Sequence, residues 1–286
     1  MPELPEVEAI TRELARDATG KRVERCEVAA LSALKTYEPP IEALVGKQID
    51  SCSRRGKFIC VEIEDLWLVL HLARGGWVRL RAELPASRAR LGRSPLALRL
   101  GFGDGGGVEV TEMGHEKRLA IYVVRDPIEV AGVARLGPDP LDPAFDAEAL
   151  EAILAKTSGT LKAALCDQSL IGGVGNAYSD EALHLARLSP FKPAAKLDAH
   201  EVRRLHSGLV ELLSAAVERS VGLGISELKG DKKSSMRVHG RTGQPCPECG
   251  DKIREISFAT KSWQYCPKCQ TGGKVLADRR LSRLLK

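Results

Sequence analysis

No long hydrophobic run occurs in this sequence. Its best apolar stretch, Leu66 to Val78, is interrupted by His71 and Arg74, whereas a helix that crosses a bilayer needs roughly 18–20 apolar residues. The N-terminus also lacks the features of a secretory signal, because residues 2–8 contain three acidic side chains and two prolines. Together these absences predict a soluble protein of the cell interior, located in the cytoplasm and without a membrane partner.

Internal repeats and low-complexity segments are missing as well. Hydrophobic residues make up 43% of the chain and charged residues 28%, a balance that excludes disordered, collagenous and coiled-coil proteins. The chain has 286 residues. Because domains usually contain about 100–150 residues, we expect two domains and a small additional module.

Basic charge is concentrated near the C-terminus. Residues 229–286 contain 14 Lys and Arg against 5 Asp and Glu, a local charge of +9, whereas the first 228 residues carry −4. A basic region of this kind indicates a polyanionic partner, which for a soluble protein is usually nucleic acid. A merely solvated basic tail would have the same composition, and charge alone does not choose between the two.

The eight cysteines fall into two groups. Four lie apart among apolar neighbours and are interpreted as buried free thiols: Cys26, Cys52, Cys60 and Cys166. The others form two CxxC pairs with 16 residues between them: Cys246 with Cys249, and Cys266 with Cys269. This spacing lets four thiolates surround one zinc ion, whereas a reducing cytosol disfavours two disulfides. Four thiolates leave no position for water, so we predict one structural zinc ion that holds a small β-hairpin.

The pattern of apolar residues changes along the chain. Residues 4–18 have the spacing of an amphipathic helix, and residues 22–124 contain short β-type runs typical of an antiparallel sandwich or barrel. Three prolines within residues 138–143 then indicate a domain boundary. Beyond it the pattern is helical, and the expected helices cover residues 149–155, 161–166, 177–188 and 198–217.

Two further segments stand out. Gly172–Glu181 places closely spaced glycines directly before a helical run, where exposed N–H groups suit a phosphate. On its own this segment is equally an ordinary turn between helices, and it is no P-loop, because Gly-Lys-Ser/Thr does not follow. Arg54–Lys57 is a basic turn between two strands, which in isolation is best interpreted as a solvated hairpin tip.

Four separated motifs occur in one order and span nearly the whole chain. They are Pro2–Glu8 (Pro-Glu-Leu-Pro-Glu-Val-Glu), Arg54–Lys57 (Arg-Arg-Gly-Lys), Gly173–Tyr178 (Gly-Val-Gly-Asn-Ala-Tyr) and the four-cysteine segment. With these motifs the chain resembles the formamidopyrimidine-DNA glycosylase and endonuclease VIII family of base-excision repair enzymes.

The resemblance implies an α+β fold with DNA held in a cleft. An N-terminal helix and an antiparallel β-sandwich form the first domain, a helical helix–two-turn–helix domain the second, and a zinc-finger β-hairpin the C-terminal module. The corresponding boundaries are residues 1–130, 147–228 and 236–272, followed by a basic tail of residues 273–286.

Pro2 carries the most specific chemistry. Once the initiator Met is removed, its secondary amine becomes the chain terminus, and an α-amino pKa of about 7.7–8.0 leaves a fraction unprotonated near neutral pH. Such an amine can attack the sugar C1′ atom, expel a damaged base and form a covalent iminium. The iminium permits strand cleavage by β-elimination and, in the resembled family, usually by δ-elimination.

The resemblance assigns roles to three neighbouring side chains. It makes Glu3 the proton donor for opening of the sugar ring and Glu6 the partner of the amine and its waters. Lys57 corresponds to a lysine that acts as an acid and contacts phosphate during elimination. Without the resemblance, Glu3 and Glu6 are simply acidic residues that complement the dipole of the first helical turn.

The resemblance also implies phosphate contacts. Asn176 matches an asparagine that binds the phosphates flanking the lesion, and we expect Lys162 to be a second phosphate ligand. An arginine usually lies five residues before the third zinc cysteine, where this chain has Lys261. Lysine keeps the charge but lacks the two-pronged guanidinium, so weaker phosphate binding and weaker δ-elimination are expected.

The residues that fill the space of a flipped base depart from the family pattern. The loop that usually contains a Met is His71–Trp77 here, with Arg74 at the Met position, and the usual Arg-Phe wedge is replaced by Glu116–Leu119, which contains Arg118. We expect His71, Arg74 and Arg118 to contact DNA. Filling that space offsets an unstacking cost of about a few kcal/mol, so these changes are expected to alter the choice of substrate.

Two classes of function are consistent with the sequence. The first is a bifunctional DNA glycosylase and AP lyase that acts on double-stranded DNA containing a damaged base or an abasic site. The second is a binding protein on the same scaffold with little turnover. An intact Pro2, its two glutamates and Lys57 favour the enzyme, because binding alone needs none of them.

The lesion itself stays open between an oxidised purine, an oxidised pyrimidine and an alkylated base. Segment Gly222–Arg237 is short for the loop that covers oxidised guanine in the guanine-specific branch of the family. We expect a monomer, associated with the nucleoid and containing one structural zinc ion.

Overall fold

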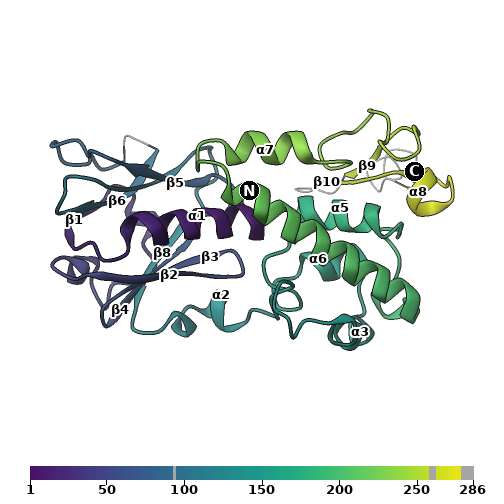
Figure 1. Ribbon diagram of the computed structural model, residues 1–286, viewed down its shortest axis with the longest axis horizontal. Coiled ribbons are helices and arrows are strands. Elements are labelled where there is room, and N and C mark those ends of the chain that lie inside the picture. Colours follow the sequence, from purple (N-terminus) through teal and green to yellow (C-terminus); the bar gives the residue numbers. More distant parts are fainter. Residues whose placement is uncertain (93–94, 258–261, 278–286) are drawn as a thin grey trace, which may run out of the picture. The chain divides into compact units, whose positions relative to one another are not determined.

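The computed structural model describes residues 1–92, 95–257 and 262–277. They form two compact units, coloured from purple to teal and from teal to yellow along most of their length (Figure 1). The N-terminal unit contains residues 1–136 and 217–228, and the C-terminal unit contains residues 137–216 and the described chain from 229 onward. Within the described residues no helix is both long enough and apolar enough to cross a membrane.

The N-terminal unit begins with helix α1 (Leu4–Ala18), as the apolar spacing predicts. Pro5 suits the first turn because its missing N–H would have no partner inside the helix. The carboxylate of Glu6 reaches back and accepts a hydrogen bond from the N–H of Glu3 at 2.8 Å, which satisfies another N-terminal donor. The face that packs into the core carries Val7, Ile10 and Leu14.

Two separate four-stranded antiparallel sheets follow α1. The first has the strand order β1-β6-β7-β5 and the second the order β2-β3-β4-β8. Their bounds are β1 Val23–Val28, β2 Ile49–Arg55, β3 Phe58–Ile63, β4 Leu66–His71, β5 Gly76–Arg81, β6 Leu96–Phe102, β7 Gly107–Glu112 and β8 Ala120–Val124. Residues of both sheets and of α1 share one apolar core, so the unit is a sandwich rather than a closed barrel.

The C-terminal unit is mainly helical before the cysteine segment, as expected. Its helices are α3 Ala147–Ala155, α4 Leu161–Cys166, α5 Asn176–Leu185 and α6 Ala199–Val221, and the last residues of α6 belong to the N-terminal unit. Short helical segments elsewhere are α2 Ala131–Ala134 and the 3₁₀ turns Leu31–Ala33, Ile41–Leu44, Pro127–Glu129 and Ala194–Lys196.

Local chemistry sets the helix ends. The side chain of Asp146 caps α3 by accepting a hydrogen bond from the N–H of Ala149 at 2.8 Å. Helix α5 instead starts from the glycine turn, where Gly173 has a φ of +91° that favours glycine. It ends three residues before the expected residue 188, because the chain turns at Arg187, whose φ is +52°.

Segment Gly222–Arg237 is largely helical. Helix α7 (Leu228–Ser235) occupies its second half. The ammonium of Lys232 lies 4.6 Å from the centre of the buried Tyr178 ring, a cation–π contact within the C-terminal unit. This segment is therefore a helix with a fixed contact to the unit's core over these residues, not a loop throughout.

A small hairpin lies between the two cysteine pairs, as predicted. Strands β9 (Arg254–Ser257) and β10 (Ser262–Tyr265) pair antiparallel, and helix α8 (Pro267–Thr271) follows. The apolar core of this module consists of Val238, Cys246, Ile253 and Cys266. So few apolar residues cannot offset the chain entropy of folding, which is why the module needs a metal.

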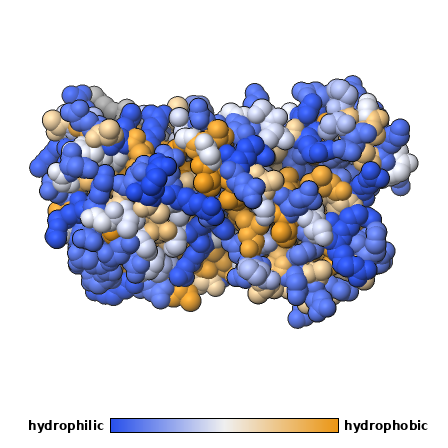
Figure 2. Space-filling model, in the orientation of Figure 1, coloured by the Kyte–Doolittle hydropathy of each residue, from blue (hydrophilic) through white to orange (hydrophobic). Residues whose placement is uncertain are grey.

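Polar residues cover most of the face drawn in Figure 2. Large aromatic side chains such as Tyr178 and Tyr265 are almost fully buried. The large hydrophobic residues that are exposed lie apart along the chain: Met1, Leu31, Tyr37, Val45, Leu91, Met113, Ile128, Val221 and Val275. The apolar part of the sequence is thus spent mainly on the interiors of the two units.

Candidate functional site

The N-terminus of α1 carries an unusual cluster of buried acidic groups. Glu3 and Glu6 are each only 2% exposed, and Pro2 beside them is also buried. Glu6 is held by the N–H of Glu3, and both carboxyl groups lie at the positive end of the helix dipole. Two buried carboxyl groups thus stand next to the residue that becomes the chain terminus when Met1 is removed.

The basic turn between β2 and β3 is fixed to α1. Arg54 donates to the carboxylate of Glu8 at 2.7 Å and also to the carbonyl of Gly56 at 3.1 Å. Burial raises the pKa of Glu8, but the hydrogen bonds from Arg54 and Arg12 outweigh it and bring that pKa below its ordinary value. Lys57 is only 7% exposed. A solvated hairpin tip is therefore the wrong interpretation of this turn.

His71 lies beside this turn. It ends β4 opposite Phe58 of β3, and the two rings are tilted with their centres 4.7 Å apart. Burial, reinforced by the positive charge of Lys57, lowers the pKa of His71 to about 4. The imidazole is consequently neutral near pH 7 and can exchange hydrogen bonds with a ligand without adding charge.

Two exposed arginines occupy neighbouring loops of the N-terminal unit's strands. Arg74 lies between β4 and β5, next to Ala73, whose φ is +48°. Arg118 lies between β7 and β8, where its side chain is 71% exposed and 3.4 Å from a Glu116 oxygen. Both arginines are therefore accessible to a partner, as expected for DNA contacts.

Glu112, which the sequence did not single out, secures the loop of Arg118. It is 4% exposed, and one carboxylate oxygen accepts hydrogen bonds from the N–H groups of Arg118 at 2.6 Å and Leu119 at 2.8 Å. An acidic residue at the end of a strand is too common to be recognised as a loop anchor from sequence.

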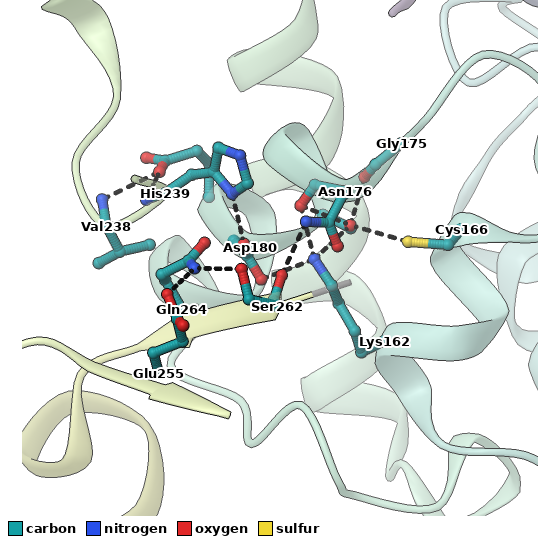
Figure 3. A network of polar contacts seen from close by, with 12 residues as sticks. Lys162, Cys166, Gly175, Asn176, Asp180, Val238, His239, Glu255, Ser262 and Gln264 are labelled. Atoms are coloured by element: carbon teal, nitrogen blue, oxygen red, sulfur yellow. Dashed lines mark hydrogen bonds and ion pairs between the residues drawn. The ribbon is translucent and has the colours of Figure 1, made fainter. Parts of the chain in front are cut away.

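Asn176 is the first residue of α5, directly after the glycine turn. Its side-chain nitrogen donates to the carbonyl of Ser262 in β10 at 2.8 Å (Figure 3). Its side-chain oxygen is buried and has no hydrogen-bond partner among the described residues. The amide is thus held in one orientation by the C-terminal hairpin. Lys261, the other expected phosphate contact of this region, lies outside the described residues.

Lys162 does not occupy the position expected for a phosphate ligand. Its side chain is completely buried. The ammonium donates to the carbonyl of Asn176 at 2.6 Å, to the hydroxyl of Ser179 at 2.7 Å and to the carboxylate of Asp180 at 2.6 Å (Figure 3). Three protein acceptors use all three protons of the ammonium group. The expectation that Lys162 binds phosphate is therefore wrong, and its role is to hold the start of α5.

Asp180 and Glu181 form a buried acidic pair that sequence analysis missed. The second oxygen of Asp180 lies 2.7 Å from Nδ1 of His239 (Figure 3). Glu181 accepts hydrogen bonds from three consecutive backbone N–H groups, those of residues 237, 238 and 239, at 2.8–2.9 Å. Burial raises the pKa of Glu181 even though these N–H groups oppose the shift. The pair fastens the segment before the cysteine module to α5.

The four predicted cysteine ligands converge. Their sulfur atoms all lie within 4.8 Å of one another, with Sγ–Sγ distances of 3.9 Å for Cys246 and Cys269 and 3.4 Å for Cys249 and Cys266. A tetrahedral site with Zn–S bonds of about 2.3 Å has edges of roughly 3.8 Å. The donor set and its dimensions therefore fit one zinc ion without an open coordination position.

Family models match three consecutive parts of the chain. The formamidopyrimidine-DNA glycosylase N-terminal domain matches residues 1–112, the formamidopyrimidine-DNA glycosylase H2TH domain matches residues 136–227, and the zinc finger found in FPG and IleRS matches residues 243–272. A formamidopyrimidine-DNA glycosylase of Symbiobacterium thermophilum is 34% identical over 98% of this chain and 93% of its own length. The chain belongs to the formamidopyrimidine-DNA glycosylase family.

Two further members of the family are informative. A formamidopyrimidine-DNA glycosylase-like protein of Mycobacterium tuberculosis is 58% identical, over 53% of this chain and 94% of its own length. The Lactococcus lactis enzyme in complex with DNA containing FAPY-dG is 30% identical and superposes with a TM-score of 0.83, covering 94% of this chain and 100% of that one. The family assignment agrees with the sandwich, the helical domain and the zinc-binding hairpin described above, and it gives the four-cysteine site one structural zinc ion.

Proposed function

We propose that this chain excises a damaged base from double-stranded DNA through a Schiff base on Pro2 and then cuts the strand at the abasic site. Membership of the formamidopyrimidine-DNA glycosylase family makes it a base-excision repair enzyme, a DNA N-glycosylase with AP lyase activity. The observation that supports the roles of individual residues is the burial of Glu3 and Glu6 beside Pro2 at the start of α1.

The amine of Pro2 is the nucleophile in this proposal. After removal of Met1 it is a secondary amine, and a pKa of about 7.7–8.0 leaves part of it with a free electron pair at neutral pH. That pair forms the N–C1′ bond, and the bond from C1′ to the damaged base breaks as the base departs with the bonding electrons and takes up a proton. Glu3 protonates the ring oxygen O4′ as the C1′–O4′ bond opens, which yields the iminium.

Strand cleavage follows from the iminium. Its positive nitrogen withdraws electrons, so a proton can leave C2′ and the phosphate on C3′ departs by β-elimination. Lys57, buried in the turn that Arg54 fastens to α1, is positioned to contact and protonate the departing phosphate group. Glu6 orients the N-terminal segment through its bond with the N–H of Glu3.

DNA is held by residues from several loops. Asn176 contacts the phosphates flanking the lesion, and the exposed Arg74 and Arg118 contact the space left by the flipped base. His71, neutral near pH 7, contributes a hydrogen bond rather than a charge, and Lys261 contributes a phosphate contact. These residues come from one chain, so we expect a monomer that acts at the nucleoid in the cytoplasm.

Borohydride trapping on a duplex with one abasic site tests the proposal. Reduction attaches the protein to DNA only if an amine has formed an iminium. We expect the chain that begins at Pro2 to be trapped, and the same chain with an N-terminal tag to lose both trapping and base excision, because an amide nitrogen has no available electron pair. Pro2→Gly keeps a primary amine and should trap more slowly.

The matched control carries the same tag at the C-terminus and should be trapped like the untagged chain. Efficient trapping of the N-terminally blocked chain would eliminate Pro2 as the nucleophile. If the untagged chain binds the abasic duplex but is not trapped, the chain is a damage-binding protein instead. Lys57→Ala should still be trapped while strand cleavage slows, since Lys57 acts after the iminium has formed.

A further inference from the structure

Helix α5 carries a polar stripe that contacts the cysteine module. Asn176, Asp180 and His184 are spaced four residues apart, so they lie above one another on the same face of the helix. Asn176 contacts Ser262 at 2.8 Å and Asp180 contacts His239 at 2.7 Å. The third residue of the stripe, His184, contacts one of the four zinc-binding cysteines.

His184 lies against the zinc site from the helix side. Its Nε2 atom is 3.3 Å from Sγ of Cys246, within hydrogen-bond distance for sulfur. His184 is 2% exposed and Cys246 is 3% exposed. The other ring nitrogen, Nδ1, is buried and has no hydrogen-bond partner among the described residues. A histidine with an unpaired nitrogen is a costly way to fill apolar space that a phenylalanine could fill.

The chemistry of the zinc site determines where the imidazole proton must be. Four thiolates around Zn²⁺ carry a net charge of −2, and burying that charge is unfavourable unless donors are directed at the sulfur atoms. If Nε2 lacked a proton, its electron pair would face the negative sulfur of Cys246. In either charge state of the ring, the arrangement that attracts the thiolate is the one with the proton on Nε2.

We propose that His184 donates its Nε2–H to the Cys246 thiolate and acts as a positioning residue in the outer shell of the zinc site. The hydrogen bond withdraws negative charge from the sulfur and fixes the ligand's orientation, as outer-shell partners of metal ligands do. It also joins the zinc site to α5, whose first residue, Asn176, is held by β10 of the same module. The zinc ion thereby helps to fix both ends of the helix.

Cobalt substitution and zinc release test this assignment in the full-length protein. His184→Phe fills the same space without a donor. We expect its zinc to transfer to a chromogenic chelator about 10–100-fold more readily, the usual effect of losing an outer-shell partner. In the cobalt-loaded protein, loss of the hydrogen bond raises the energy of the sulfur electrons, so the sulfur-to-cobalt charge-transfer band should move to longer wavelength.

His206→Phe is the matched control. This histidine lies in the same unit and bonds to the carbonyl of Phe145 at 2.6 Å, far in sequence from the cysteines. It should lower thermal stability without moving the cobalt band or the rate of zinc release. If His184→Phe behaves like this control in both measurements, His184 is a packing residue and the proposal is overturned.

Two polar variants keep the test decisive if His184→Phe does not fold. The amide nitrogen of Gln extends to about the position of Nε2, whereas that of Asn is shorter and does not reach the sulfur. His184→Gln should therefore retain zinc and the cobalt band nearly as the wild type does, and His184→Asn should lose both properties. Equal behaviour of the Gln and Asn variants would contradict a hydrogen bond to Cys246.

Discussion

Burial decides what each lysine of this protein does. Lys57 and Lys162 both belong to motifs that suggest phosphate binding, yet their surroundings differ. Lys162 has no exposed surface and gives all its protons to protein oxygens. Lys57 lies in a turn between two strands, and 7% of its surface is exposed. An ammonium that is fully used by the protein cannot also bind DNA, so only Lys57 remains a candidate for chemistry.

Replacing Lys162 with Met should destabilise the protein without changing its contacts to DNA. Methionine has a similar length but leaves the buried Asp180 without its cation, which costs about 3–5 kcal/mol. Urea unfolding should show this loss, whereas the exposed-site control Lys196→Met should be neutral. Combining Lys162→Met with Asp180→Leu should recover part of the loss. A change smaller than about 1 kcal/mol in Lys162→Met would contradict the importance of this pair.

Helix α5 is the element on which the C-terminal unit is organised. Lys162 holds its first turn, and Asp180 and Glu181 fasten the segment of residues 237–239 to it. A single carboxylate that accepts three backbone N–H groups defines the path of that segment more tightly than apolar packing could. In the N-terminal unit, the Arg54–Glu8 pair fastens the β2–β3 turn to α1 in a comparable way.

Replacing Glu181 with Gln tests the fastening of residues 237–239. The amide keeps one acceptor oxygen, but its NH₂ group opposes at least one of the three N–H groups, at a cost of about 1–3 kcal/mol. We expect amide hydrogen exchange at residues 237–239 to accelerate by about tenfold or more, while zinc stays bound. The control Glu211→Gln, on the exposed face of α6, should leave this exchange unchanged. Unchanged protection in Glu181→Gln would show that the segment is held by other contacts.

Charge is distributed unevenly over the whole molecule. Residues 229–286 carry +9, whereas the first 228 residues carry −4. The acidic part includes Glu3 and Glu6, which we propose take part in catalysis, and the basic part includes Lys261, which we propose contacts phosphate. Such a division suits a polyanion that is attracted mainly through one part of the chain and processed by groups in another.

DNA binding should therefore depend strongly on salt. Each phosphate that the protein neutralises contributes about −0.9 to the slope of log K against log salt concentration for duplex DNA. Lys261→Ala should reduce the magnitude of the slope by about 0.9, and Lys162→Met should leave it unchanged because Lys162 is buried. Fluorescence anisotropy with an abasic-site duplex at several salt concentrations measures both. A slope near zero in the wild type would argue against the phosphate contacts proposed for this chain.

Much of this molecule follows from local patterns in the sequence. The period of the apolar residues predicted α1, the turn between β2 and β3, and the helical character of the C-terminal unit. The CxxC spacing predicted the zinc site and its hairpin, because two short loops of fixed length leave four sulfur atoms few other arrangements. The four motifs in their order led to the family, which the comparisons confirmed.

Only the tertiary structure decided which polar residues are internal. Lys162, Asp180, Glu181 and His184 have the sequence neighbourhood of an ordinary helix and its approach, and nothing local distinguishes them from solvated side chains. Their partners lie 14 to 62 residues away along the chain. The free energy of a buried charge or imidazole depends on the atoms that surround it in space, and the fold alone brings those atoms together.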